Sequence, residues 1–319
     1  MTAQQNAPQI VLGTMDHGTR VEQTTAFRLL DRFVEAGGHW LDTANCYAFW
    51  TDPSGLGGAS ERVLGAWLRA NPGVRSAVGL ATKVRQDPRV AHAWPESAEG
   101  LSASAVRAGL DGSLERLGVD HVDLLWAHAE DRTVDLAETV AAFGEAVAEG
   151  RATRIGAANH ASWRVQQARD LARRQGVAAW SALQLRHSLV QPRPGTTVPE
   201  AGHKLLAPDD LDHARTEGLD LWCYTPLMMG GYTRADRPFS AGYAHPGTER
   251  VLRVLDEVAR ETGATPNQVV LAWLMSQGIS PIVGASRIEQ VDEAMSARDV
   301  TLSPRPRPRF ADARGGRPP

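Results

Sequence analysis

Short apolar runs alternate with longer segments of helical periodicity along almost the whole chain. The run at 9–15 comes first, and the segment 22–37 then places Phe27, Leu30, Phe33 and Val34 at helical spacing. The same alternation predicts further strands at 39–44, 76–84, 121–128, 152–159, 180–185, 219–227 and 279–286. It predicts further helices at 60–70, 102–118, 133–149, 161–175, 208–217 and 266–277, and a last helix through about Ala297. We therefore expect a repeated strand–helix unit that occurs eight times.

Two architectures accommodate such a repeat. The strand runs are continuously apolar, which is typical of parallel strands buried on both faces. Eight strand–helix units in about 250 residues match a closed (β/α)8 TIM barrel. The alternative is a doubly wound open sheet, which usually carries a Gly-rich phosphate turn after its first strand. The turn here, GTMDHGTR, lacks the G-x-G-x-x-G pattern. The sequence favours a single-domain α/β barrel over residues 1–302.

Two segments fall outside the eightfold repeat. A long connection at 228–247 is followed by an additional predicted helix at about 247–262. The tail at 303–319 contains five Arg and five Pro in seventeen residues. This composition cannot form a packed core, so we expect the tail to be disordered.

Composition restricts the class of protein. The chain has 319 residues, is 42% hydrophobic and 22% charged, and has a formal net charge of -3. These values are typical of a soluble globular enzyme and give no basic stripe for nucleic acid. No apolar run approaches the ~20 residues that span a bilayer, and the N-terminus has no signal-peptide pattern. We expect a cytoplasmic protein, most simply a monomer, with a small-molecule partner. A disulfide between Cys46 and Cys223 is not expected, nor is a metal site.

Four polar residues lie at or just beyond predicted strand ends, where a barrel places its active site. They are Asp42, Tyr47, Lys83 and His128. Taken singly, each has a structural explanation, such as a solvated lysine or a packed tyrosine. Together they form a proton relay, in which the Lys83 cation lowers the pKa of the Tyr47 phenol and Asp42 holds the ammonium in position. His128 would be a neutral donor to a carbonyl oxygen.

The motifs that carry these residues resemble those of the aldo-keto reductase superfamily. LGTM, DTANCY, ATK, DLLWAHAED and GASRIEQVDE occur in the family's order along nearly the whole chain. The resemblance implies catalytic roles for Asp42, Tyr47, Lys83 and His128. It also implies reversible, NADPH-dependent reduction of an aldehyde or ketone to an alcohol, without a metal.

The resemblance also implies a nicotinamide site. Asn159 and Gln184 match residues that bind the carboxamide, whereas Ala158 stands where the family usually has Ser. Tyr224 would stack under the nicotinamide ring, which the resemblance favours over the alternative of simple packing at a strand end. The loop that begins with Thr225 and includes Leu227 would surround the pyrophosphate.

The last motif implies a site for the 2′-phosphate and adenine of NADPH. Gly284, Ser286, Arg287 and Gln290 span the end of the eighth strand and the first turn of a helix, where an anion is favoured. Glu293 is the adenine contact that carries over, and Ala294 replaces the usual Asn. The alternative for Arg287 is a surface ion pair with Glu289 or Glu293.

The substrate is the least constrained part of the interpretation. Phe49 and Trp50 follow Tyr47 and could form an aromatic wall above it, with His17 and Trp126 also at the mouth. Without an apolar lid, the mouth would be open and polar, which favours a sugar-like or natural-product carbonyl. One rival function is a catalytically weak, nucleotide-binding regulatory subunit of the same fold. Another is a lyase or isomerase on an unrelated barrel.

Overall fold

The computed structural model describes residues 7–196, 202–302 and 306–313. Its parallel strands form a closed barrel in which each strand pairs with the next and β8 pairs with β1. The strands are β1 (Val11–Gly13), β2 (Trp40–Asp42), β3 (Gly79–Val84), β4 (Val122–Ala127), β5 (Ala152–Ala158), β6 (Ala182–Arg186), β7 (Asp220–Tyr224) and β8 (Ile279–Gly284). The (β/α)8 barrel and its eight predicted strands are therefore confirmed.

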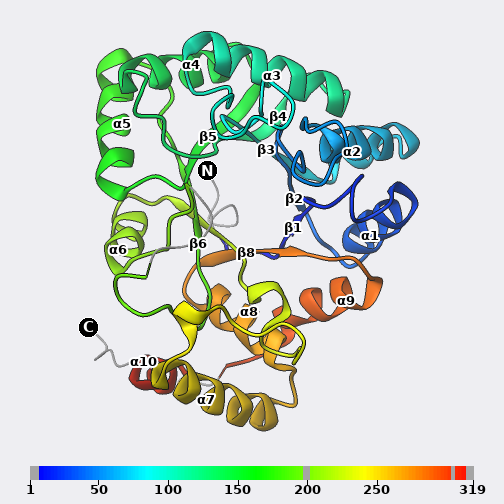
Figure 1. The fold of residues 1–319 in the computed structure, drawn as a ribbon, viewed down its shortest axis with the longest axis vertical. Coiled ribbons are helices and arrows are strands. Elements are labelled where there is room, and N and C mark those ends of the chain that lie inside the picture. The colour runs from blue at the N-terminus through cyan, green and yellow to red at the C-terminus, as the bar shows by residue number, and fades with distance from the viewer. Residues whose placement is uncertain (1–6, 197–201, 303–305, 314–319) are drawn as a thin grey trace.

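Helices surround the barrel, and each strand is followed by a helix in the predicted order (Figure 1). They are α1 (Gln23–Glu35), α2 (Ala59–Ala70), α3 (Ala103–Leu117), α4 (Leu136–Ala148), α5 (Ser162–Gln175), α6 (Pro208–Thr216), α8 (Pro266–Ser276) and α9 (Ile288–Ser296). The additional helix predicted after the seventh strand is α7 (Pro246–Thr262). Short 3-10 turns lie at Val74–Ser76, Met228–Gly230, Ala241–Tyr243 and Ala297–Asp299.

The barrel interior is packed with large side chains below the site. Trp222 contacts both Trp40 and Trp126, with ring centroids 5.2 and 5.4 Å apart. These indoles belong to an apolar cluster built from alternate strand residues, separate from the cluster between strands and helices. Alternate residues of a barrel strand point inward. The indoles therefore close the barrel axis beneath the polar groups described below.

The C-terminal tail differs from the expectation of disorder. Residues 306–313 form a helix, α10 (Pro306–Ala313), which lies along α7 (Figure 1). Phe310 is fully buried and packs against the Trp273 ring, 6.3 Å between centroids. The Arg309 guanidinium pairs with Glu257 and Glu261 of α7. The composition of the tail does not show that Phe310 is buried or that Glu257 and Glu261 pair with Arg309. Proline is tolerated in the first turn of a helix. The remaining tail residues lie outside the described part of the chain.

Candidate active site

Inward-facing strand positions change from apolar to polar towards one end of the barrel. The change takes two residues, which is the period that keeps side chains on one face of a strand. It runs from Trp40 to Asp42 in β2, from Ala81 to Lys83 in β3, from Trp126 to His128 beyond β4, and from Ala182 to Gln184 in β6. Because the strands are parallel, these polar groups meet at their carboxyl ends, above the packed indoles.

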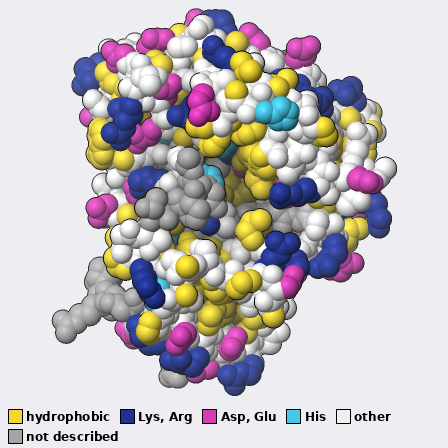
Figure 2. Space-filling model, in the orientation of Figure 1, with side chains coloured by type: hydrophobic (Ala, Val, Ile, Leu, Met, Phe, Trp, Pro, Cys, Tyr) yellow, Lys and Arg dark blue, Asp and Glu magenta, His cyan; other side chains and the backbone are white. Residues whose placement is uncertain are grey.

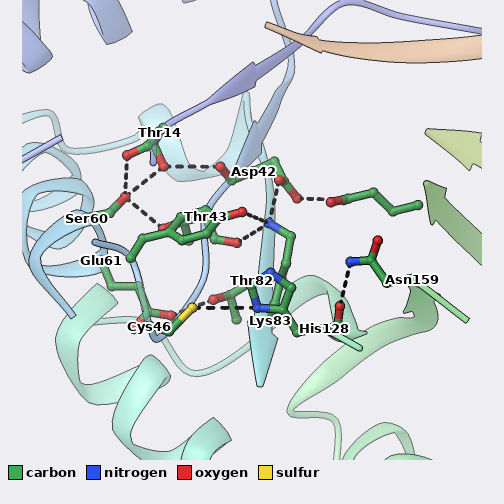
Figure 3. A network of polar contacts seen from close by, with 12 residues as sticks. Thr14, Asp42, Thr43, Cys46, Ser60, Glu61, Thr82, Lys83, His128 and Asn159 are labelled. Atoms are coloured by element: carbon green, nitrogen blue, oxygen red, sulfur yellow. Dashed lines mark hydrogen bonds and ion pairs between the residues drawn. The ribbon is translucent and has the colours of Figure 1, made fainter. Parts of the chain in front are cut away.

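Lys83 is at the centre of this polar group and is fully buried. Its Nζ lies 2.5 Å from Asp42 Oδ2, 2.7 Å from the Thr43 carbonyl oxygen and 3.0 Å from the Tyr47 hydroxyl oxygen. An ammonium carries three protons, so all of its donors are used. The Gln184 amide donates to the other Asp42 oxygen over 3.2 Å. Figure 3 shows Asp42, Thr43 and Lys83 converging from β2 and β3.

Hydroxyl groups support the backbone that Lys83 contacts. Ser60 Oγ lies 2.8 Å from both Thr43 Oγ1 and Thr14 Oγ1, and it donates to the Thr14 carbonyl oxygen over 2.8 Å. The Thr14 hydroxyl also lies 3.2 Å from the Asp42 carbonyl oxygen. These contacts join the ends of β1 and β2 to the first turn of α2 (Figure 3). Sequence reasoning missed this cluster, because nothing local distinguishes these residues from ordinary loop hydroxyls.

The pKa of Tyr47 shifts in the direction opposite to the one expected. Burial raises the pKa of the phenol well above its usual value, and the nearby Asp42 carboxylate and Cys46 raise it further. Burial also raises the pKa of Asp42, against the opposing effect of Lys83. The predicted contact between Lys83 and the phenol is present, but desolvation outweighs it. Tyr47 is therefore protonated at neutral pH, as a proton donor must be.

His128 lies beside Tyr47 at the end of β4. The two rings are perpendicular, with centroids 5.8 Å apart. Burial lowers the pKa of His128 well below its usual value, and the Lys83 cation lowers it further, so the imidazole is neutral. The Cys46 thiol, which sequence reasoning considered only as a possible disulfide partner, lies 3.6 Å from His128 Nδ1. Its place next to Tyr47 in DTANCY was the only available signal.

Asn159 and Tyr224 meet at the same end of the barrel. Asn159 Oδ1 accepts from the Tyr224 hydroxyl over 2.6 Å and from the Lys204 backbone N–H over 3.0 Å. Asn159 Nδ2 donates to the His128 carbonyl oxygen over 3.0 Å, and its second amide proton has no acceptor among the described residues. Asn159 adopts a left-handed φ of 58°, a conformation that occurs disproportionately at functional sites. Ala158 is fully buried at the end of β5 and offers no hydroxyl there.

The loop after β7 holds an unusual backbone. Thr225, Met228 and Met229 have φ values of 57°, 50° and 58° without being glycines. Leu227 lies between them and is half-buried. The Tyr232 hydroxyl anchors the loop by accepting from the Val190 N–H over 2.9 Å. Strained loops of this kind are held by their surroundings and cluster at ligand sites.

Three donors converge on one oxygen where α9 begins. Gln290 Oε1 accepts from the Ser286 N–H over 2.8 Å, the Ser286 hydroxyl over 3.2 Å and the Arg287 N–H over 3.2 Å. Free N–H groups at a helix start form an anion site, and here the amide oxygen takes the anion's place. A methyl group added at Gly284 would meet no atom within 4 Å, so the approach to these donors is open.

Arg287 does not form the surface ion pair that was its alternative explanation. Its side chain is exposed and pairs with no carboxylate among the described residues. Glu293 instead accepts from the Thr265 hydroxyl over 2.6 Å and from Asn267 Nδ2 over 3.2 Å. The Arg287 guanidinium is therefore available at the start of α9, whereas Glu293 already has protein partners.

Aromatic rings stand next to Tyr47. Trp50 is 45% exposed, and its ring centroid lies 6.1 Å from that of Tyr47 and 5.0 Å from that of Phe49. Phe49 in turn contacts Trp94 at 5.7 Å. We call Phe49, Trp50 and Trp94 the aromatic shelf. Figure 2 shows a hollow near the centre of one face, with hydrophobic side chains around it.

The expectation that His17 and Trp126 line the mouth is wrong. His17 is 1% exposed, and burial lowers its pKa to about 4. Trp126 is fully buried within the barrel. Both side chains are buried, so Phe49 and Trp50 are the only residues predicted for the mouth that the structure leaves partly exposed.

A half-buried carboxyl group joins the two loops that flank the site. Glu99 Oε1 accepts from Asn45 Nδ2 over 2.6 Å and from the Arg85 N–H over 2.5 Å. Asn45 comes just before Cys46, and Arg85 just after β3. Burial raises the pKa of Glu99 to about 7 and that of neighbouring Asp87 to about 6.

Glu99→Gln is expected to flatten the pH dependence of stability. Since the pKa of Glu99 rises from 4.5 to about 7 on folding, its contribution to stability is present below pH 4.5 and declines as pH rises to about 7. The shift in the pKa of Glu99 corresponds to at most about 3 kcal/mol in the free energy of unfolding. Urea unfolding at pH 5 and pH 8 measures it, and Gln keeps the accepting oxygen. Equal pH slopes in the wild type and the variant would contradict the assignment.

Both cysteines are free and buried. Within the described ranges, no group of three or more His, Cys, Asp or Glu side chains could hold a metal ion. None of the helices in those ranges is long and apolar enough to cross a membrane.

Comparison with known proteins agrees with this geometry. The model of the Aldo/keto reductase family matches residues 9–310. An uncharacterized oxidoreductase, YrpG, of Bacillus subtilis is 28% identical over 311 residues, covering 92% of this chain and 88% of the relative. Norsolorinic acid reductase stcV of Emericella nidulans is 29% identical, covering 92% and 75%. Aryl-alcohol dehydrogenase [NADP(+)] of Phanerodontia chrysosporium is 26% identical, also covering 92% and 75%.

Proposed function

Because the chain belongs to the aldo/keto reductase family and is an oxidoreductase of carbonyls or alcohols, we propose that it reduces an aldehyde or ketone with NADPH and uses Tyr47 as proton donor. One observation carries the proposal. The buried Lys83 ammonium joins Asp42 to the Tyr47 hydroxyl, beside a neutral His128. Tyr47 would provide a proton, Lys83 a cation that stabilises the resulting phenolate, and His128 a neutral hydrogen-bond donor, all at the same end of the barrel.

The four residues divide the work of proton transfer. NADPH, when bound, supplies the hydride that the carbonyl carbon receives. The Tyr47 hydroxyl gives its proton to the carbonyl oxygen, and solvent later replaces it. Lys83, 3.0 Å from that hydroxyl, stabilises the phenolate as it forms, and Asp42 keeps the ammonium in place. His128 donates a hydrogen bond to the same carbonyl oxygen.

The residues predicted for cofactor binding fit a nicotinamide dinucleotide. The second amide proton of Asn159 would be a donor for the carboxamide oxygen, and Gln184 of β6 donates to Asp42 of β2 across the barrel end. The half-buried ring of Tyr224 would offer a surface for the nicotinamide, and the loop from Thr225 to Leu227 would surround the pyrophosphate. Ala158 and Ala294 each remove one contact that the family usually has.

The start of α9 supports NADPH rather than NADH. A 2′-phosphate would take over the donors of Ser286 and Arg287 that now bind the Gln290 oxygen. The exposed guanidinium of Arg287 would add a charge-assisted contact. Gly284 leaves the approach open, whereas Glu293 is less available for adenine than the sequence suggested, because Thr265 and Asn267 occupy it.

Arg287→Ala is therefore expected to weaken NADPH binding about 10–150-fold and to leave NADH binding nearly unchanged. The loss reflects one charge-assisted contact to the phosphate. Fluorescence titration with both cofactors measures it, with Arg253→Ala, an exposed arginine of α7, as the matched control. Equal losses for both cofactors, or a wild type that prefers NADH, would place the phosphate elsewhere.

The aromatic shelf favours an aromatic carbonyl over a sugar. Trp50 exposes part of its ring beside Tyr47, so a flat substrate ring can pack against it while its carbonyl reaches the hydroxyl. One relative is named a norsolorinic acid reductase and another an aryl-alcohol dehydrogenase, and the second name agrees with an aryl substrate.

A panel of aryl aldehydes, aryl ketones and open-chain sugars, followed by loss of nicotinamide absorbance, tests both the reaction and the substrate class. We expect kcat/KM to be highest for the aryl compounds. Tight NADPH binding without turnover of any member would instead favour a regulatory subunit. Preference for sugars would contradict the role of the shelf.

A further inference from the structure

We propose that Cys46 is a positioning residue: its thiol donates a hydrogen bond to His128 Nδ1 and thereby holds the neutral imidazole with its proton on Nε2. The inference rests on the proposed function in one respect, namely that Nε2–H is the donor to the carbonyl oxygen. The existence of the Cys46–His128 pair does not depend on that function.

The backbone fixes both members of the pair. Cys46 is 1% exposed and lies in the turn after β2, where the Asn45 N–H donates to the Lys83 carbonyl oxygen over 3.1 Å. The His128 N–H donates to the Val84 carbonyl oxygen over 3.0 Å. The turn and the end of β4 are thus both attached to β3, and Cys46 Sγ lies 3.6 Å from His128 Nδ1 (Figure 3). This contact therefore follows from the barrel and its turns.

Both groups are neutral. Burial raises the pKa of the Cys46 thiol, and the negative charge of Asp87 raises it further. Burial and the Lys83 cation keep the pKa of His128 low. One proton therefore lies between Sγ and Nδ1, and the contact is either S–H to nitrogen or N–H to sulfur.

Chemistry selects the first arrangement. The lone pair of a neutral imidazole is a strong acceptor, whereas thiol sulfur is a weak one. Two cations, Lys83 and Arg85, act on His128. The three protons of Lys83 are bound by Asp42, Thr43 and Tyr47, and the Arg85 guanidinium donates to Gln86, so neither cation has a hydrogen bond to the imidazole among the described residues. With Nδ1 as acceptor, the imidazole proton is on Nε2. The opposite tautomer would turn a lone pair towards the carbonyl oxygen and repel it.

The test reads the tautomer directly. In protein with ¹⁵N-labelled histidine, the chemical shifts of the ring nitrogens identify which one carries the proton, and the His128→Asn spectrum assigns the His128 signals. We expect the wild type to be protonated on Nε2. Cys46→Ala should give a mixture of tautomers, and Cys46→Ser, which retains a donor, should restore Nε2–H. Cys223→Ala, which removes a fully buried thiol from β7, is the matched control.

Kinetics provide the second measurement. Cys46→Ala should lower kcat about 5–50-fold with KM for NADPH unchanged, whereas Cys46→Ser and Cys223→Ala should stay within about 3-fold of wild type. A proton on Nδ1 in the wild type would overturn the proposal, as would an unchanged tautomer in Cys46→Ala. If Cys46→Ala does not fold, the wild-type and Cys46→Ser spectra decide. If the wild type reduces no carbonyl, the proposed function fails while the spectra still test the pair.

Discussion

Tyr47→Phe is expected to lower the rate of carbonyl reduction about 10²–10⁴-fold while NADPH binding stays close to wild type. The substitution removes only the hydroxyl that Lys83 contacts. The phenyl ring still fills the space beside Trp50 and His128, so the shelf and the fold are preserved. Single-turnover rates with an aryl aldehyde, together with a fluorescence titration of NADPH, measure the two quantities separately.

Tyr243→Phe is the control for this prediction. Tyr243 is buried, lies in a 3-10 turn before α7, and belongs to no predicted catalytic group. Its variant should reduce carbonyls at the wild-type rate. Near-normal reduction by Tyr47→Phe itself would remove Tyr47 from the mechanism and leave the proton donor unassigned.

Lys83→Met should lower the free energy of unfolding by about 3–5 kcal/mol, in addition to abolishing efficient turnover. The side chains of Lys83 and Asp42 are 0% and 3% exposed, so the variant leaves a carboxylate buried without its counter-charge. Urea unfolding at pH 7 measures the loss.

The double variant Lys83→Met/Asp42→Leu separates stability from catalysis. Removing the second charge should recover most of the lost stability, because a buried ion pair and apolar side chains of similar volume are often comparable in free energy. Reduction should stay as slow as in Lys83→Met. If Lys83→Met were as stable as the wild type, the buried Asp42 carboxylate would not need the Lys83 counter-charge.

The sequence was sufficient for the barrel, because its strands are buried on both faces and its helices follow a regular apolar period. It was also sufficient to place Asp42, Lys83 and His128 at strand ends. Since all carboxyl ends of a parallel barrel meet, these residues had to lie together once the fold was correct. The structure brings them together with Tyr47, and their roles stay predictions.

Other features depend on packing that no local pattern encodes. The upward shift of the Tyr47 pKa arises from desolvation, which depends on what covers the phenol. The contact between Cys46 and His128 joins residues 82 positions apart through the conformation of a turn. α10 was missed because composition describes an average over the tail, whereas one side chain, Phe310, anchors the helix.

The Gln290 oxygen at the start of α9 would make binding of the proposed phosphate an exchange of hydrogen-bond partners rather than a simple addition. The N–H groups of Ser286 and Arg287 would have an acceptor before and after the exchange, so the first turn of α9 is already ordered before a phosphate binds. The net gain in binding free energy would be only the difference in hydrogen-bond strength between the Gln290 amide oxygen and the ligand oxygen that replaces it. A neutral hydroxyl would bind these donors about as strongly as the Gln290 oxygen does, whereas a charged phosphate oxygen would bind them more strongly. An internal competitor of this kind sharpens discrimination by charge without any clash against the wrong ligand.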